Sequence, residues 1–210
     1  MPAARPFCRH AIDPARFRGT VETSNGGNVA DRERTSVVSA RLGSLVGVNG
    51  GFFITSDVDG VQGTVAGISA VDGRLESMAV GSRAALILAD GGRRPLIADL
   101  STNVTVRVGA ASYAVRGINR VPGKVRNCGR PGGVPTDRPR HDTTCTIADD
   151  LVKFTPAFRA PLPQGAGTQV VLDARGRVVS VGERGGSVPA DGTVLQGIGG
   201  AADWLTGHAR

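Results

Sequence analysis

The sequence predicts an α+β fold dominated by strands, in which twisted antiparallel hairpins carry a few packed helices. Composition is the first observation: 31 of the 210 residues are Gly and only 4% are aromatic, which favours turn-rich β structure over a helical bundle. The second is a recurring pattern in which an Asp–Gly turn separates two runs of alternating apolar residues. With 40% apolar residues, the chain can form one domain with a real core.

Two short stretches have helical character. In the first, over residues 35–45, apolar side chains recur at helical spacing on one face: Val38, Leu42 and Leu45. Thr35 or Ser36 is the predicted N-cap of this helix, and Gly43 weakens its end. The second stretch, residues 201–205, predicts a short helix carrying the single Trp of the chain.

Four hairpins supply the predicted scaffold. Asp–Gly and Gly-rich turns between alternating apolar residues are a strong short-range hairpin signal, because Gly and Asp tolerate the positive φ of tight turns. The pattern places hairpins over residues 68–77, 86–97, 104–118 and 170–181.

Residues 46–53, VGVNGGFF, form the stretch around which the chain is predicted to be organised. Val46 to Val48 reads as the end of a buried strand, and the following Asn–Gly–Gly predicts a turn with at least one positive φ. Two interpretations remain open. The turn is either a tight connection between core strands, or a nest in which the N–H groups of Gly50 and Gly51, with the amide of Asn49, bind an anion.

The charge balance is strongly basic. The formal net charge is +7 and the pI is about 10.5, but the Arg residues are scattered and are not interleaved with aromatic side chains. We therefore expect no nucleic-acid partner, although a basic surface can attract phosphate-bearing substrates or anionic cell-wall polymers. No apolar run approaches the roughly 18 residues of a transmembrane helix, and residues 1–9 do not have the apolar region of a signal peptide.

Short motifs follow one another in a fixed order along the chain: VGVNGGFF at 46–53, GIS at 67–69 with DG at 72–73, SRAA at 82–85, GINR at 117–120, VVLD at 170–173 and GTVLQG at 192–197. This ordered set resembles the phosphodiester glycosidase family, which includes an enzyme that uncovers mannose phosphate by removing N-acetylglucosamine. The resemblance covers nearly the whole chain, and the pattern is similar to secreted actinobacterial members.

The resemblance implies hydrolysis of a sugar-1-phosphodiester by an exported protein, with a phosphorylated sugar or cell-wall glycan as partner. A phosphomonoester departs readily, so recognition of the anion matters more than acid assistance. The implied catalytic residues are Asn49 and Asp142; the implied substrate-binding residues are Gly50, Gly51, Arg83 and Arg120. For three of them a structural interpretation is favoured: a solvated turn charge for Arg83, a surface charge for Arg120 and a loop cap for Asp142.

Two Cys residues, Cys128 and Cys145, flank a loop rich in Pro, Gly and Arg. In an exported protein we expect a disulfide between them, because the loop has little apolar content to hold itself; two free thiols are the alternative. Cys8 is left over. The remaining ligand types are dispersed, at His10, His141 and His208, so no metal site or other cofactor is expected.

One departure from the family limits the expected activity. Family members continue into a second half with an Arg-Thr-Ala segment and an Asp-Gly-Gly-Gly-Ser motif, and neither occurs in these 210 residues. We therefore expect an incomplete phosphodiester glycosidase domain over residues 1–210. The alternatives are a non-catalytic, secreted carbohydrate- or cell-wall-binding module and an inactive fragment of the family.

Overall fold

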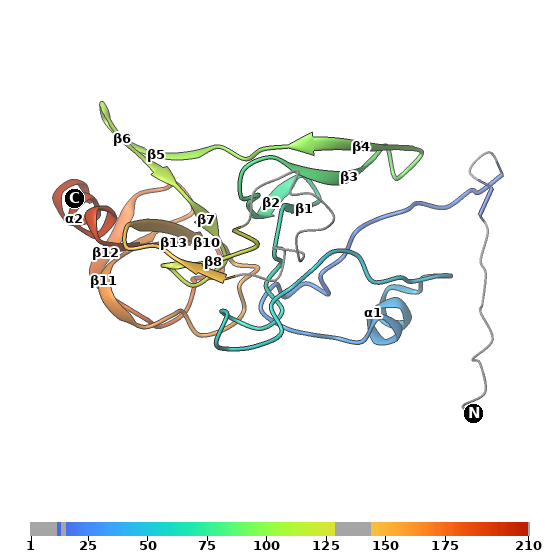
Figure 1. The fold of residues 1–210 in the computed structure, drawn as a ribbon, viewed down its shortest axis with the longest axis horizontal. Coiled ribbons are helices and arrows are strands. Elements are labelled where there is room, and N and C mark those ends of the chain that lie inside the picture. The colour runs from blue at the N-terminus through green and yellow to red at the C-terminus, as the bar shows by residue number, and fades with distance from the viewer. Residues whose placement is uncertain (1–11, 14–15, 129–143, 210) are drawn as a thin grey trace, which may run out of the picture.

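The computed structural model describes residues 12–13, 16–128 and 144–209 and has the predicted strand-dominated α+β architecture (Figure 1). Among these described residues, two helices and thirteen strands follow one another. Their bounds are α1 Thr35–Leu42, β1 Ser69–Val71, β2 Arg74–Ser77, β3 Arg83–Ala89, β4 Arg94–Leu100, β5 Val104–Val108, β6 Ala111–Val115, β7 Gly117–Ile118, β8 Lys124–Arg126, β9 Thr144–Thr146, β10 Asp150–Phe154, β11 Gly165–Leu172, β12 Val178–Arg184, β13 Thr193–Ile198 and α2 Gly200–His208.

A five-stranded sheet in the order β12-β11-β13-β10-β7 forms the centre of the C-terminal part. Neighbouring strands are antiparallel except β10 and β7, which are parallel. Side chains alternate between its two faces, so each face has its own core. One core joins Val115, Leu151, Val170, Leu195, Ala201 and Leu205; the other joins Val29, Val152, Phe154, Phe158, Leu162 and Val194.

Helix α2 packs on the first of these cores, where Ala201 and Leu205 are buried. A Cβ atom on Gly197 would come within 2.7 Å of the backbone carbon of Ala201, so Gly at this position of β13 permits the close approach of the helix. The predicted C-terminal helix is therefore confirmed, and it extends somewhat beyond the predicted residues 201–205.

All four predicted hairpins are present as antiparallel pairs: β1–β2, β3–β4, β5–β6 and β11–β12. Asp72 and Asp90 both have positive φ, as tight hairpin turns require. Among the described residues, the first three pairs each form a separate two-stranded sheet, whereas β11–β12 joins the five-stranded sheet. Antiparallel pairing thus dominates the fold, as the sequence predicts.

The first predicted helix is present but ends earlier, at Leu42, where Gly43 adopts the left-handed conformation with φ 64°. The predicted N-cap is wrong: Arg34 is the capping residue, and its side chain makes no capping hydrogen bond. No residue of α1 is buried, and Leu42 is 58% exposed. The apolar face that predicts this helix therefore packs on no core in the described structure.

The predicted buried strand at Val46 to Val48 is wrong. Residues 46–51 adopt no regular strand, and Val48 is 80% exposed. Neither Gly50 nor Gly51 has positive φ, so the predicted tight turn is absent as well. The physical reason is that residues 46–51 have no strand beside them in the described part of the chain. Within residues 46–53, only Phe53 forms a β-bridge, and its partner is Val65. Neither α1 nor α2 has the length and apolar character that a membrane-spanning helix requires.

Candidate functional site

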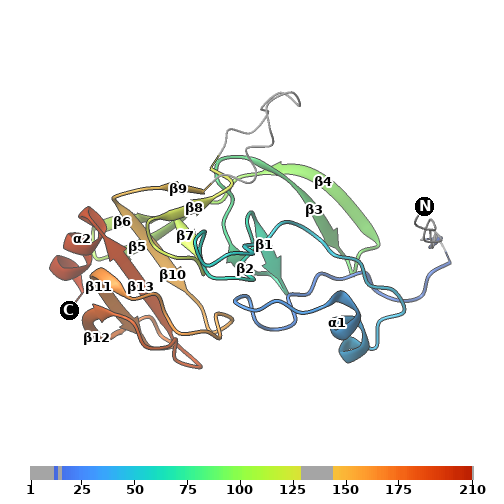
Figure 2. The ribbon, with the colours of Figure 1, turned by 60° about the horizontal axis from the view of Figure 1, so that its bottom comes forward.

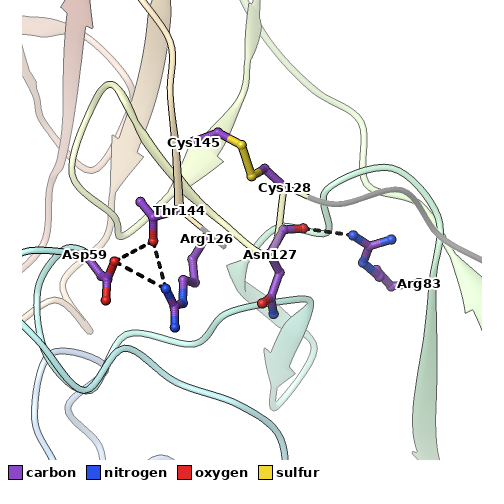
Figure 3. The surroundings of a disulfide bond; sticks show 7 residues. All are labelled: Asp59, Arg83, Arg126, Asn127, Cys128, Thr144 and Cys145. Carbon is purple, nitrogen blue, oxygen red and sulfur yellow. Dashed lines mark hydrogen bonds and ion pairs between the residues drawn. A yellow bond between two sulfur atoms is a disulfide. The ribbon is translucent and has the colours of Figure 1, made fainter. Parts of the chain in front are cut away.

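The Cys128–Cys145 disulfide links the end of β8 to β9, and the prediction of this bond is confirmed (Figure 3). The two Cα atoms are 6.0 Å apart, within the usual span of a disulfide. In the β8–β9 hairpin Arg126 pairs with Thr144, and Val125 pairs with Cys145. The covalent bond therefore fixes the place from which the polar side chains of this hairpin extend.

A polar triad holds residues 54–66 against this hairpin. Asp59 accepts a hydrogen bond from the hydroxyl of Thr144 at 2.7 Å and forms an ion pair with Arg126 at 3.2 Å. Arg126 also donates to the Thr144 hydroxyl at 2.9 Å, which closes the triangle in Figure 3. Nearby, Lys124 Nζ donates to the carbonyl of Val58 at 2.6 Å. Two cations thus reach from β8 to the same loop.

Arg83 and Asn127 form the second half of the surroundings of the disulfide. Arg83, at the start of β3, donates to the backbone carbonyl of Asn127 at 2.8 Å (Figure 3). The Asn127 side chain donates to the carbonyl of Ala66 at 2.5 Å and is 5% exposed. Its Oδ1 atom is buried and has no hydrogen-bond partner among the described residues. A buried acceptor of this kind is costly, so a donor from a water or a ligand would stabilise it.

A small cavity of about 30 Å³ lies between residues 54–67, the end of β2 and residues 116–126. Four cationic side chains and one anionic side chain line it: Arg116, Arg120, Lys124, Arg126 and Asp59. Its volume suits about one water molecule, so a larger ligand would bind at the mouth. Asp59 pairs with Arg126, and Asp150 pairs with Arg120 from outside the lining, so the remaining excess of positive charge comes from Arg116 and Lys124. This excess makes the cavity a candidate site for an anion.

Arg120, a predicted phosphate ligand, forms a buried ion pair instead. It contacts both carboxylate oxygens of Asp150, at 2.6 and 2.9 Å, and Gly123 N–H donates to the same carboxylate at 2.8 Å. The Asp150 side chain is fully buried. Arg120 also donates to three backbone carbonyls, those of residues 116, 121 and 124. These bonds occupy the guanidinium. The Arg120 side chain is only 15% exposed, so the favoured interpretation as a surface charge is wrong, and Arg120 instead forms a structural ion pair.

The other predicted site residues are not brought together. Asn49, Gly50 and Gly51 are exposed, and a Cβ atom added at either Gly would meet no atom within 4 Å. They therefore form no enclosed anion nest among the described residues. Arg83 is tied to the disulfide region, as described above. Asp142 lies outside the described residues, together with His141, His10 and Cys8.

Glu76 on β2 is a polar residue that sequence reasoning missed. Burial raises the pKa of its carboxyl group above the usual value, and the nearby negative charge of Asp72 raises it further. The Asn25 side chain donates a short hydrogen bond to Glu76, and Asn119 donates to its backbone carbonyl at 3.0 Å. Sequence alternation gives no signal for this environment, because the hydrogen-bonding partners Asn25 and Asn119 are far away along the chain. No cluster of three metal-ligating side chains occurs among the described residues.

A second depression, of about 310 Å³, lies elsewhere, between the β5–β6 hairpin and the turn after β11. Apolar side chains such as Val106 and Leu195 line it together with Lys153, Asp173 and Asp191. None of the site residues predicted from the sequence lines this groove. Its charges are mixed, so it offers no comparable excess of positive charge.

Comparison with solved structures identifies proteins with a similar fold. The chain is 34% identical, over 95% of its length, to a "Putative exported protein" from Burkholderia pseudomallei, with a TM-score of 0.78. It spans only 42% of that protein's length. A hypothetical protein from Synechocystis is 16% identical, with a TM-score of 0.61, over 90% of this chain and 31% of that one, and it shares the fold alone. No known protein-family profile and no curated protein matches the chain.

Proposed function

We propose that this chain is the substrate-anion-binding part of an exported phosphodiester glycosidase, which hydrolyses a sugar-1-phosphodiester to a free sugar and a phosphomonoester. The observation that carries the proposal is the cationic cavity beside the disulfide, with four basic side chains and one acidic one in its lining. The family resemblance of the sequence supplies the reaction, and the cavity supplies a place for the anion.

The chemistry of the substrate fits this lining. A phosphodiester carries one negative charge that persists at all physiological pH values, and Arg and Lys bind such an anion through charge-assisted hydrogen bonds. Within the cavity, Asp59 neutralises Arg126, whereas Lys124 donates to an uncharged carbonyl.

Hydrolysis breaks the bond between the anomeric carbon and the phosphate oxygen. Water adds a hydroxyl group to the anomeric carbon, and its other proton ends on the released phosphomonoester or in solvent. The family resemblance gives this chemistry to Asn49 and Asp142, with Gly50, Gly51 and Arg83 as further ligands of the substrate. Arg120 is left out of the substrate contacts, because Asp150 holds it.

Export is part of the proposal. The similar Burkholderia protein is named as exported, and a disulfide such as Cys128–Cys145 persists in oxidising compartments and is rare in the cytosol. The proposed partner is accordingly a phosphorylated sugar or a phosphate-bearing cell-wall glycan.

The test measures binding and turnover of a sugar 1-(methyl phosphate) by the 210-residue chain and two charge variants. We expect Lys124→Met and Arg116→Ala each to weaken binding of the phosphodiester about tenfold or more. Arg175→Ala is the matched control, because Arg175 is exposed in the turn after β11 and lies outside the cavity lining, and it should leave binding unchanged.

Equal affinity in all four proteins would refute the cavity as the anion site. Binding that follows the expected order without release of reducing sugar would favour the alternative, a non-catalytic module that binds phosphate-bearing glycans. Release of sugar that ceases in the two cavity variants would support the hydrolase.

A further inference from the structure

Exposed apolar side chains are concentrated in the first half of the chain. Of the sixteen large hydrophobic side chains that are exposed in the described structure, thirteen belong to residues 12–97. Of the fourteen buried hydrophobic residues, only Val29 and Ile54 belong to that half. The N-terminal half thus has apolar residues but almost no core of its own. Soluble proteins rarely leave such surface open unless it binds something.

The β3–β4 hairpin shows this most clearly. Leu86 and Ile97 face each other across the two strands and are 59% and 74% exposed. On the opposite face, Leu96 is 57% exposed. Among the described residues β3 and β4 pair only with each other, and a two-stranded ribbon is marginally stable by itself. Its free edges and both of its apolar faces are therefore suited to contact with another polypeptide.

The segment after α1 exposes apolar side chains as well. Leu45, Val48 and Phe52 are 89%, 80% and 69% exposed. The two ribbon views agree that α1, this segment and the β3–β4 hairpin all lie on the side of the molecule away from α2 (Figures 1 and 2). We call this set of exposed apolar residues, from α1 to β4, the apolar end.

The solved relative indicates what covers the apolar end. The match covers 95% of this chain but only 42% of the Burkholderia protein. More than half of that protein is therefore polypeptide beyond the matched fold. In the Burkholderia protein, the matched fold is 34% identical to this chain, and the unmatched polypeptide is longer than the matched part. A polypeptide of that length is large enough to bury the apolar end.

We propose that the apolar end is the docking surface for a polypeptide equivalent to the unmatched part of the Burkholderia protein, which pairs with the β3–β4 ribbon and covers Leu45, Val48 and Phe52. The exposed Asn49–Gly–Gly segment lies within this surface and becomes enclosed on docking. The inference is independent of the proposed function, because docking is measured without any substrate.

The test adds the unmatched part of the Burkholderia protein, produced as a separate polypeptide, to this 210-residue chain. We expect a one-to-one complex and at least tenfold slower hydrogen exchange of the amides of residues 45–53 and of the β3–β4 hairpin. Ile97→Asp should weaken the complex at least tenfold, because it puts a charge into the covered face. Val179→Asp is the matched control, an equally apolar and 66% exposed position on β12 that should have no effect.

The same two parts joined in one chain provide a second measurement in case the separate polypeptide does not fold. There the exchange of residues 45–53 should again be at least tenfold slower than in the 210-residue chain. Unchanged exchange in both formats would overturn the proposal. It would also be overturned if the 210-residue chain alone formed a stable dimer through Ile97, because a second copy would then be the occupant.

Discussion

The buried ion pair between Arg120 and Asp150 provides the sharpest test of how the structure assigns a predicted site residue. The Asp150 carboxylate is fully buried and accepts two hydrogen bonds from Arg120 and one from the amide of Gly123. In the Arg120→Met variant, the Asp150 carboxylate loses both hydrogen bonds from Arg120 and keeps the one from the Gly123 amide. Removing one partner of a buried pair costs about 3–5 kcal/mol, because the other charge stays buried without compensation.

The double variant Arg120→Met with Asp150→Leu removes both charges. Its loss of unfolding free energy should be smaller than the sum of the two single losses by about 2 kcal/mol or more, because no buried charge is then left alone. Urea unfolding of the four proteins measures this coupling. The control is Arg177→Met, which breaks an ion pair with Asp173 whose side chains are 69% and 29% exposed, and it should cost less than about 1 kcal/mol.

An additive cycle, or a loss below about 1 kcal/mol for Arg120→Met, would refute the structural assignment of Arg120. If the variant unfolded at the normal urea concentration but lost affinity for a phosphodiester, Arg120 would return to the substrate contacts that the family resemblance implies.

Three further predictions concern the disulfide, a buried carboxyl group and two Gly residues. Replacing Cys145 by Ser should lower the unfolding free energy by about 3 kcal/mol, since it frees a loop with a sequence separation of 17, and non-reducing peptide mapping of the parent chain should find the bond to Cys128. Burial in the folded chain raises the pKa of Glu76 above its ordinary value of 4.5, so between that value and the raised pKa the folded protein binds more protons than the unfolded chain. Stability should therefore fall as pH rises through the raised pKa, and Glu76→Gln should remove this slope in urea midpoints taken from pH 4 to 7. Gly43→Ala should lower the unfolding free energy by about 1 kcal/mol, because Gly43 has a φ of 64° that Ala adopts only with strain. Gly51→Ala should change the unfolding free energy by less than about 0.5 kcal/mol, because Gly51 does not have positive φ. Equal losses in the two variants would contradict the exposed, relaxed segment described for residues 46–53.

Local sequence signals predicted the hairpins well because each hairpin is decided by a few adjacent residues. Asp72 and Gly73 both take positive φ in the turn between β1 and β2, which is the conformation that their residue types tolerate best. The disulfide was also predictable, since Cys128 and Cys145 flank a single loop. Gly43 ended α1 for the same local reason.

The site was far less predictable, because its contacts join residues that are distant along the chain. The ion pair of Asp59 with Arg126 spans residues that no local pattern connects. Likewise, Arg120 has the same residue type and the same sequence neighbours whether it binds phosphate or Asp150, and only the position of β10 beside β7 decides between them. The strand β13, central to the large sheet, was not predicted as a strand at all.

By itself, the sequence determined the turns of the four hairpins, the strand pairs joined by those turns and the two helices, because each depends on backbone preferences within a few residues. It also determined the disulfide, because the two Cys residues flank a single loop. The tertiary structure decided which apolar residues are buried. Val46 and Val48 have strand-forming side chains, yet they are exposed because no neighbouring strand lies beside them in the described structure. A buried strand requires partners that supply its hydrogen bonds and cover its side chains, and those partners are set by the whole fold rather than by the strand.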